Sequence, residues 1–390
     1  SNLAGAYKGG YDFVNLDSNP MDDNGHGTNT AGVLASNQTA NRGIARNINL
    51  VSVKVLDSTA TGTFSNIAAG IDWCVTNKNA YNISVITMSL GTSSTYTPLT
   101  SPAYIEPSIQ NAYDSNIALV ASSGNNGVTN GISYPAVSPY VISVGASYDA
   151  NVGSKTWTLS NSSTCTDSIT NSGTVVCFTN RASFLDLMAP GSVISTTSLG
   201  GLFTSVSGTS LAAPHVAGTI ALMAQRNPNI SPAQIENALK SSGVSIVDVP
   251  TGVTFPRVNA YGSVLLTPYL KKIGSLGAGN TIYFDIIAPM DAGLDYLFGL
   301  SVGNAPGFAL GDGRVVPLDV TDSFLLPISL YAPQSISLYN SSGTVTLNGN
   351  QAVLYLPNVP GLENLNLYSA FVTVNVTDFS VPTVSNSVKL

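Results

Sequence analysis

The sequence predicts an α/β protein in which a mostly parallel β-sheet carries helices on both faces, followed by an all-β sandwich domain. Three observations predict this fold class. Between residues 47 and 150, runs of Val, Ile and Leu alternate with helical patterns. A long helix that is apolar nearly all round follows at 210–226. After about Pro268, short alternating runs separated by Gly, Pro and Asn take over. At roughly 100–200 residues per domain, the length favours two domains, 1–267 and 268–390.

The first domain is expected to hold four buried strands with helices between them. Each strand is a nearly continuous run of Val, Ile, Leu and Ala, and these runs are residues 50–56, 83–90, 117–121 and 141–144. The helical patterns cover residues 64–79 and 104–114. Apolar strands that alternate with helices are typical of a parallel sheet covered on both faces.

Residues 151–183 interrupt this alternation with a polar stretch that predicts an excursion of short strands. Cys165 and Cys177 lie in it, twelve residues apart. They either close a surface hairpin through a disulfide, if the compartment is oxidising, or remain two free thiols. Cys74 lies in an apolar helical pattern, where it is expected to pack as a small hydrophobic residue.

The helix expected at 210–226 is apolar on nearly every side, which indicates burial in a core. Pro214 falls in its first turn, where a missing N–H costs little. A helix is expected at 232–241, and residues 258–265 close the α/β part. Short strands expected in the second domain, which are typical of an antiparallel sandwich, are 282–286, 335–339, 352–356 and 371–374.

Composition narrows the classes of function. Only 9% of the residues are charged, where about 25% is usual, and the net charge is −7 without a basic cluster. Nucleic acid is therefore not an expected partner, because binding it requires many Lys and Arg contacts to phosphate. No apolar run reaches the roughly 20 residues that a membrane span needs. Scarce charge favours a secreted protein, extracellular or at the cell surface.

His26 and Ser210 stand in segments suited to catalysis. Ser210 follows Gly208-Thr209 at the entry to the buried helix, where free N–H groups and the positive end of the helix dipole suit an oxyanion. A serine nucleophile needs a base, and His26 in Gly25-His26-Gly27-Thr28 is the candidate. His215 lies one turn after Ser210 and is expected to be a packed helix residue.

Asn125 is the candidate for a second oxyanion donor. It stands in Ser122-Ser123-Gly124-Asn125, directly after the buried strand at 117–121. A side-chain amide at the carboxyl end of a strand can donate to a developing negative charge.

Gly25-His26-Gly27-Thr28, Ser123-Gly124-Asn125 and Gly208 to His215 together resemble the subtilisin-like serine proteases. Ser89-Leu90-Gly91, Tyr134-Pro135-Ala136 and Ala189-Pro190-Gly191 add to the resemblance, which covers about residues 5–266. The resemblance implies a subtilisin-like fold and hydrolysis of polypeptide substrates. It implies that Ser210 is the nucleophile and His26 the general base, with Asn125 and the Ser210 N–H as the oxyanion hole.

The resemblance also implies where a substrate would bind. Ser89, Leu90 and Gly91, together with the edge near Gly62, would pair with an extended peptide as added strands. Ser122, Ser123 and Gly124 would line the pocket for the side chain before the cleaved bond.

One element that the resemblance implies has no match. In these proteases the triad aspartate lies on a strand well upstream of the histidine, and here 25 residues precede His26. Asp22 and Asp23 lie too close in sequence to reach the far ring nitrogen. The acid is therefore expected from an upstream N-terminal fragment or propeptide of the same precursor, before Ser1. The alternative is a non-cleaving surface or assembly protein that reuses a protease fold.

Residues 12–21 predict a calcium site, because carboxylates and carbonyls gather in a short loop. The segment resembles the calcium loop that precedes the catalytic histidine in thermitase-like subtilisins. Carried over, Asp12 and Asp17 supply carboxylates, and Asn19 and Met21 supply main-chain carbonyls. The alternative is a solvated acidic turn.

Overall fold

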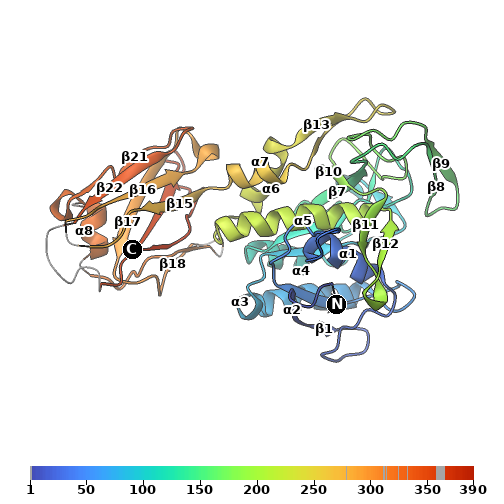
Figure 1. The fold of residues 1–390 in the computed structure, drawn as a ribbon, viewed down its shortest axis with the longest axis horizontal. Helices are drawn as coiled ribbons and strands as arrows, with labels where there is room; N and C mark the ends of the chain where they lie inside the picture. The colour runs from blue at the N-terminus through green and yellow to red at the C-terminus, as the bar shows by residue number, and fades with distance from the viewer. Residues whose placement is uncertain are drawn as a thin grey trace. The chain divides into compact units, whose positions relative to one another are not determined.

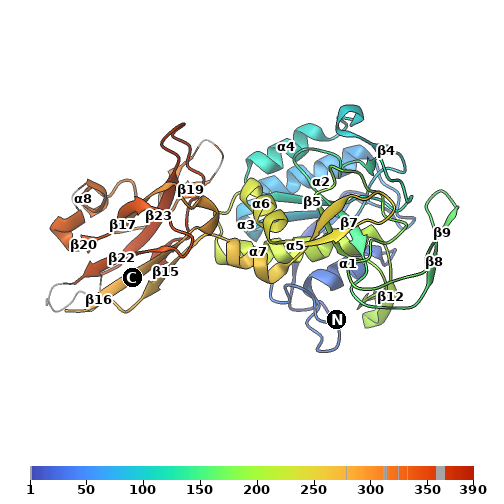
Figure 2. The ribbon, with the colours of Figure 1, turned by 90° about the horizontal axis from the view of Figure 1, so that it is seen from above.

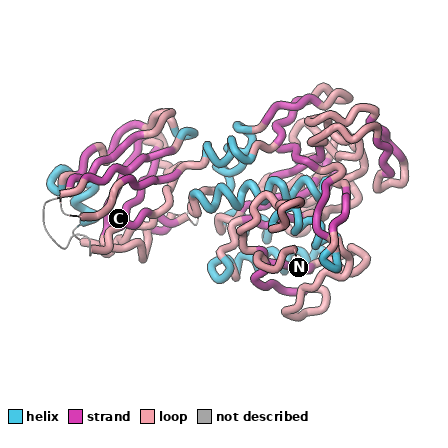
Figure 3. The backbone as a smooth tube through the Cα atoms, viewed as in Figure 1, coloured by secondary structure: helices cyan, strands magenta, loops and turns pink. Residues whose placement is uncertain are grey.

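The computed structural model describes residues 2–277, 279–310, 312, 314–323, 325–331, 333–356 and 365–390 (Figures 1 and 3). The chain forms two compact units. The first comprises Ser1–Leu222 with Leu239–Ser263, and the second comprises Met223–Ala238 with Val264–Leu390. Within the described ranges, no helix combines the length and the apolar character that crossing a membrane requires.

A six-stranded sheet forms the centre of the first unit. Its strands, in spatial order, are β13 (Val244–Val247), β14 (Thr254–Arg257), β10 (Leu187–Pro190), β7 (Ile142–Ser147), β5 (Ala118–Ser122) and β3 (Val85–Met88). All neighbours from β3 to β14 are parallel, and β13 pairs antiparallel at one edge. Every residue of β5 is buried, as its unbroken apolar run predicts. The predicted mostly parallel sheet is confirmed.

Helices cover both faces of this sheet, as Figure 2 shows. On one face lie α2 (Phe64–Thr76) and α4 (Glu106–Asp114), and on the other lie α1 (His26–Ala35) and α5 (Thr209–Arg226). Helix α3 (Lys78–Tyr81) also belongs to the first unit, whereas α6 (Pro232–Ser242) and α7 (Ala260–Leu266) each include residues of both units. Buried side chains of α2, α4, β3 and β5 form one apolar core.

Residues 50–54 differ from the prediction of a strand inside the main sheet. They form β2 (Leu50–Lys54), which pairs in parallel with β1 (Tyr7–Asp12) in a separate two-stranded sheet. Each residue of β2 is only half-buried. Among the described residues no strand pairs with the other edge of β2, and β3 likewise has β5 as its one partner.

Three short hairpins or bridges extend from the first unit. They are β4 (Thr95–Tyr96) with β6 (Ile132–Ser133), β8 (Lys155–Thr158) with β9 (Thr164–Asp167), and β11 (Ile194–Thr197) with β12 (Phe203–Val206). The β11 strand packs against α1, where a Cβ on Gly32 would overlap the hydroxyls of Thr196 and Thr197. Glycine therefore permits the close approach of α1 to this hairpin.

The second unit holds two four-stranded sheets that share one apolar core. One sheet has the order β15 (Tyr269–Ile273), β16 (Thr281–Ile287), β22 (Asn350–Tyr355) and β20 (Leu338–Tyr339). The other has the order β21 (Ser342–Thr344), β17 (Asp295–Ser301), β23 (Tyr368–Val374) and β24 (Val388–Lys389). The rings of Phe284 and Phe298, one from each sheet, lie 4.8 Å apart. A short β18 (Phe308–Ala309), β19 (Val315–Val316) and α8 (Leu325–Tyr331) complete it.

Candidate active site

His26 is the first residue of α1, and the turn before it requires glycine. Gly25 has a φ of 103°, in the left-handed region that favours glycine. Two residues into the helix, the carbonyl of Thr28 accepts a hydrogen bond of 2.7 Å from the hydroxyl of Thr197 on β11. The conformation of Gly25 and the hydrogen bond from Thr197 together fix the start of α1.

Asp22 caps the start of α1. Its carboxylate accepts hydrogen bonds from the N–H groups of Asn24, Gly25 and Thr28 at 3.0, 2.8 and 2.6 Å. The hydroxyl of Thr28 donates a further bond of 2.6 Å. Burial by itself raises the pKa of Asp22, but these hydrogen bonds outweigh it and hold the pKa below its ordinary value. This carboxylate therefore serves the helix start.

The imidazole of His26 is half-buried, and burial lowers its pKa because the charged form is disfavoured away from water. The negative charge of Asp22 raises it again in part. Within the described ranges no carboxylate is hydrogen-bonded to this imidazole; Asp23 instead lies 3.4 Å from the ammonium of Lys54. A neutral imidazole is the form that accepts a proton as a general base.

Ser210 is the second residue of α5, which has 18 residues. The N–H groups of the first turn have no carbonyl acceptor within the helix, and the positive end of the helix dipole lies there. Gly208, just before the helix, donates its N–H to the carbonyl of Gly191 at 2.8 Å. This bond ties the turn that presents Ser210 to the segment that follows β10.

Pro214 lies in the second turn of α5, not in the first as predicted. Its missing N–H is the one that would reach the carbonyl of Ser210, four residues earlier. The hydroxyl of Ser89 donates to that carbonyl at 2.7 Å. A side chain from the end of β3 therefore replaces a helical hydrogen bond directly behind the candidate nucleophile.

Asn125 is oriented by Thr209. The side-chain oxygen of Asn125 accepts from the N–H of Thr209 at 2.9 Å and from its hydroxyl at 3.0 Å. With the oxygen held, the Nδ2 group is left to donate elsewhere. A Cβ built on Gly208 would lie 3.5 Å from Asn125 Nδ2 and 3.7 Å from Ser210 N. The two predicted oxyanion donors therefore lie around one point in space.

The end of α1, the helix that His26 begins, shares an apolar cluster with the start of α5, the helix that carries Ser210. Val33 of α1 and Leu211 of α5 belong to one small apolar cluster with Ile194 of β11. His215 is part of the helix packing, with its Nδ1 2.8 Å from the carbonyl of Leu211. Burial lowers the pKa of His215.

The two predicted substrate-binding segments converge on a residue that the sequence did not single out. A Cβ on Gly91 would lie 3.1 Å from Ser133 Cβ, and a Cβ on Gly124 would overlap the hydroxyl of Ser133. Beyond both segments, the amide of Asn126 donates to the carbonyl of Ser93 at 3.2 Å. Ser133 and this bridge limit the space between the segments.

The other predicted substrate-binding residues have varied surroundings. Gly62 is exposed in the loop before α2, and a Cβ there would collide with the carbonyl of Val55. Leu90 is half-buried against the main core. Ser122 and Ser123 are buried, and the hydroxyl of Ser123 has no hydrogen-bond partner within the described ranges.

The carboxylates of the predicted calcium loop already have partners. Asp12 is buried and accepts from the N–H groups of Val14 and Asn15 at 2.8 and 2.9 Å. The ammonium of Lys54 lies 3.6 Å from it. Burial by itself raises the pKa of Asp12, but these partners together lower it. Asp17 accepts from the N–H of Asn19 at 2.8 Å.

These contacts fit a calcium ion only in part. A cation, Lys54, already balances Asp12, and the carbonyl of Asn19 accepts from the N–H of Met21 at 2.7 Å. The described residues contain no group of three or more His, Cys, Asp or Glu side chains that could hold a metal.

Cys165 and Cys177 form a disulfide, which decides between the two alternatives that the sequence left open. Cys74 is a buried free thiol, as its apolar surroundings predicted. Burial raises the pKa of Cys74 to about 12, so the thiol is unreactive at neutral pH.

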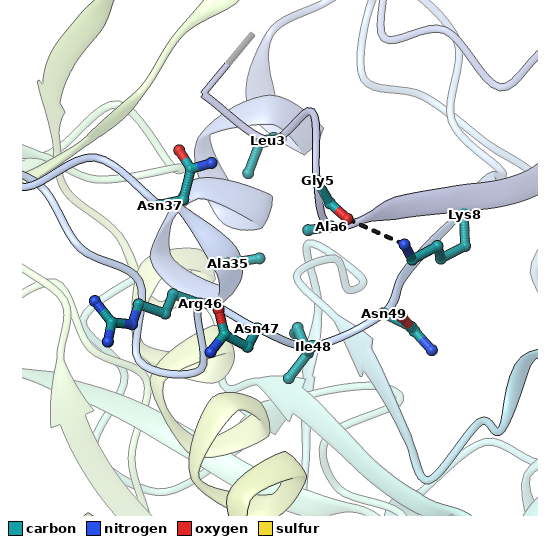
Figure 4. Close-up of a pocket in the computed structure, with 10 residues that line it drawn as sticks. All are labelled: Leu3, Gly5, Ala6, Lys8, Ala35, Asn37, Arg46, Asn47, Ile48 and Asn49. Atoms are coloured by element: carbon teal, nitrogen blue, oxygen red, sulfur yellow. Dashed lines mark hydrogen bonds between the residues drawn. The ribbon is translucent and has the colours of Figure 1, made fainter.

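A separate cavity of about 240 Å³ lies near the amino-terminal segment (Figure 4). It contains none of the predicted site residues. Its lining is polar with two cationic side chains, and the Lys8 ammonium donates to the carbonyl of Gly5 at 3.1 Å. The lining residues are Leu3, Gly5, Ala6, Lys8, Ala35, Asn37, Arg46, Asn47, Ile48 and Asn49.

Comparisons by family, by sequence and by structure all find similarity to subtilisin-like proteases. Residues 1–262 match the family described as the Subtilase family. Subtilisin DY of Bacillus licheniformis is 37% identical over 251 residues, 62% of this chain and 78% of the relative. The alkaline protease of Alkalihalobacillus alcalophilus is 35% identical over 66% of this chain, which spans only 58% of that relative. The crystal structure of a cold-adapted subtilisin-like serine proteinase matches 67% of this chain and 83% of its own, with a TM-score of 0.54 at 29% identity.

Proposed function

The chain belongs to the Subtilase family, and from that premise we propose that it is a serine endopeptidase that cuts polypeptides through an acyl-enzyme on Ser210. The observation that carries the proposal is the common point beside Gly208. Asn125 Nδ2 and Ser210 N lie 3.5 and 3.7 Å from this position, which supports the proposal that both donate to one oxyanion.

The proposed reaction has two halves. The Ser210 hydroxyl attacks the peptide carbonyl while His26 takes its proton, and the oxyanion is stabilised by Asn125 and the Ser210 N–H. The tetrahedral intermediate then expels the amine, which takes the proton from His26. Water attacks the acyl-enzyme with His26 again as base, which releases the carboxylic acid and restores Ser210.

The peptide substrate would lie along the segment that ends at Gly91 and the edge near Gly62. The side chain before the cleaved bond would enter between Gly91 and Gly124. Because Ser133 and the Asn126 bridge limit that space, we propose a preference for small side chains, such as Ala or Ser, over Phe at this position.

The triad acid is proposed to come from a segment upstream of Ser1, an N-terminal fragment or propeptide of the same precursor. The separation of β2 from β3 supports this. Helix α2 lies between these two strands in the sequence. Its buried side chains share one apolar core with Val55, just after β2, and with Met88 of β3. Among the described residues each strand has an unpaired edge. An additional strand between them would complete one continuous sheet.

The location of this gap also fits the chemistry. Parallel strands bring their carboxyl ends to one edge of a sheet, where sites in open α/β folds lie. At that end of β3, Ser89 contacts the carbonyl of Ser210. An acid at the end of an inserted parallel strand would therefore enter beside the candidate catalytic residues.

Labelling with a fluorophosphonate probe tests both parts of this proposal. Covalent modification of Ser210, located by peptide mass spectrometry and absent in Ser210→Ala, supports the nucleophile. The 390-residue chain and the product of its full gene would be compared side by side. Equal labelling rates would refute the need for an upstream acid, and no labelling of either would refute the peptidase.

A non-cleaving surface or assembly protein is the second candidate function. The observation that favours it is the lack of a carboxylate hydrogen-bonded to His26 within the described ranges. Equal binding of a target protein by the native chain and Ser210→Ala, without any product, would favour this candidate.

Secretion and calcium are further parts of the proposal. The Cys165–Cys177 disulfide supports an oxidising, extracellular location. Calcium in the loop of Asp12 and Asp17 would have to compete with Lys54, so we expect weak binding. If EDTA left the melting temperature of the protein unchanged, calcium binding at this loop would be contradicted. Residues 268–390 are proposed as a separate domain without a catalytic role.

A further inference from the structure

Asn125 stands in a loop whose main chain is held almost entirely by the polar excursion at 151–183. We call residues 124–128 the amide loop. Six main-chain groups of the amide loop hydrogen-bond to residues of this excursion. These groups are Gly124 O, Asn125 O, Asn126 N, Gly127 N, Val128 N and Val128 O.

The contacts come from two sides of the excursion. On the side of the β8–β9 hairpin, Ser160 donates its N–H to the carbonyl of Asn125 at 3.2 Å. On the returning side, Phe178 accepts from the N–H of Gly127 at 2.8 Å. Asn180, fully buried, accepts from two amides of the loop at 2.9 and 3.2 Å.

The Cys165–Cys177 disulfide joins these two sides. Cys165 is in β9 of the hairpin, and Cys177 directly precedes Phe178 on the returning side. The ring of Trp157 in β8 also meets Phe178 edge-on, with ring centroids 5.5 Å apart. Both cysteines are half-buried, not enclosed in the core.

We propose that this disulfide-closed excursion is a positioning device for Asn125. The hairpin fixes the Asn125 carbonyl, the returning side fixes the next three amides, and Thr209 fixes the side-chain oxygen. Together they aim Nδ2 at the oxyanion. The inference rests on the proposed peptidase function for its catalytic consequence, and on the hydrogen bonds alone for the order of the amide loop.

Steady-state kinetics of the active full gene product test the catalytic consequence. Dithiothreitol reduces the disulfide by two electrons and two protons, and its own thiols become a disulfide. Loss of an oxyanion donor lowers kcat by about 10²–10³, so a loosened donor should lower it by roughly tenfold, with KM within about twofold. The Cys165→Ser/Cys177→Ser protein should show the same loss and no further response to dithiothreitol.

A proline substitution separates the hydrogen bond from the disulfide. Ser162 donates its N–H to the carbonyl of Leu159 at 2.9 Å, so Ser160 is the second residue of a β-turn, where proline is favoured. Ser160→Pro removes both the N–H and the hydroxyl that donate to the carbonyl of Asn125, at 3.2 and 3.4 Å, and should reduce kcat about as much as reduction does. Thr156→Ala is the matched control, because the hydroxyl of Thr156 pairs with Thr166 across the same hairpin.

Hydrogen exchange gives a readout that needs no catalysis. Reduction should speed exchange of the amides of Asn126, Gly127 and Val128 at least tenfold, while β5 stays protected. Unchanged exchange, or a KM effect without a kcat effect, would overturn the inference. Faster exchange in a protein whose Ser210 never reacts would refute the peptidase and leave the positioning of the loop supported.

Discussion

Replacing Asp22 separates a helix cap from a catalytic acid. The carboxylate is close in sequence to His26, yet its four hydrogen bonds all go to the residues that start α1. Asp22→Ala removes these acceptors, and Asp22→Asn keeps one oxygen but removes the charge. We expect Asp22→Ala to lower stability and Asp22→Asn to do so by a smaller amount.

The expected size follows from the contacts. Losing a side-chain cap costs about 1–2 kcal/mol, and the upper end applies because Asp22 also holds the hydroxyl of Thr28. At about 2–4 °C per kcal/mol for a unit of this size, the melting temperature should fall by about 4–8 °C.

The effect should depend on pH with a defined sign. Because folding lowers the pKa of Asp22 from 3.8, its stabilisation is fully present above pH 3.8 and is lost as pH falls through the folded pKa. The difference between native and Asp22→Ala proteins should therefore be constant near pH 7 and shrink in strong acid. Removing the charge should also lower the pKa of His26, because Asp22 raises it.

Thermal unfolding and the fluorophosphonate labelling rate of the full gene product provide the assay. As a cap, Asp22→Asn should slow labelling by less than about tenfold, whereas loss of a triad acid in subtilisin costs roughly 3 × 10⁴ in kcat. A loss of that size, with the melting temperature unchanged, would refute the assignment of Asp22 as a cap.

Three further outcomes are expected. Asn125→Ala should lower kcat by about 10²–10³, measured by peptide hydrolysis. Thr209→Val should lower kcat by roughly tenfold, because it removes one of two bonds that orient Asn125 and the hydroxyl that accepts from the N–H of Gly124; an unchanged kcat would contradict this role. Arg181→Met should lower the free energy of unfolding by about 3–5 kcal/mol in urea, since it leaves the buried carboxylate of Asp248 without its 2.7 Å partner.

Much of the fold could be predicted because its strands are long apolar runs. Residues 117–121 are the clearest case, since every position of β5 is buried and period-2 alternation is absent. Residues 50–54 show the limit of that argument. They were predicted as a strand of the same sheet although they include Ser52 and Lys54, and β2 is half-buried, because burial also depends on a neighbouring strand that the local sequence does not specify.

The candidate site divides in the same way. His26, Asn125 and Ser210 stand in short segments with recognisable local patterns. Asn180 carries no such pattern, and its role depends on contacts to residues 52 and 54 positions away. Ser133 likewise carries no local pattern. It limits the proposed pocket only because Gly91 and Gly124, from two other segments, lie next to it.

The replaced hydrogen bond behind Ser210 has a mechanical consequence. Pro214 cannot donate to the Ser210 carbonyl, so Ser89 does, and Ser89 directly precedes the Leu90-Gly91 segment. The candidate nucleophile is thereby hydrogen-bonded, through its carbonyl, to the residue that precedes the segment proposed to align the peptide. A shift of that strand end on binding a peptide would therefore reach Ser210 through this hydrogen bond, without passing along α5.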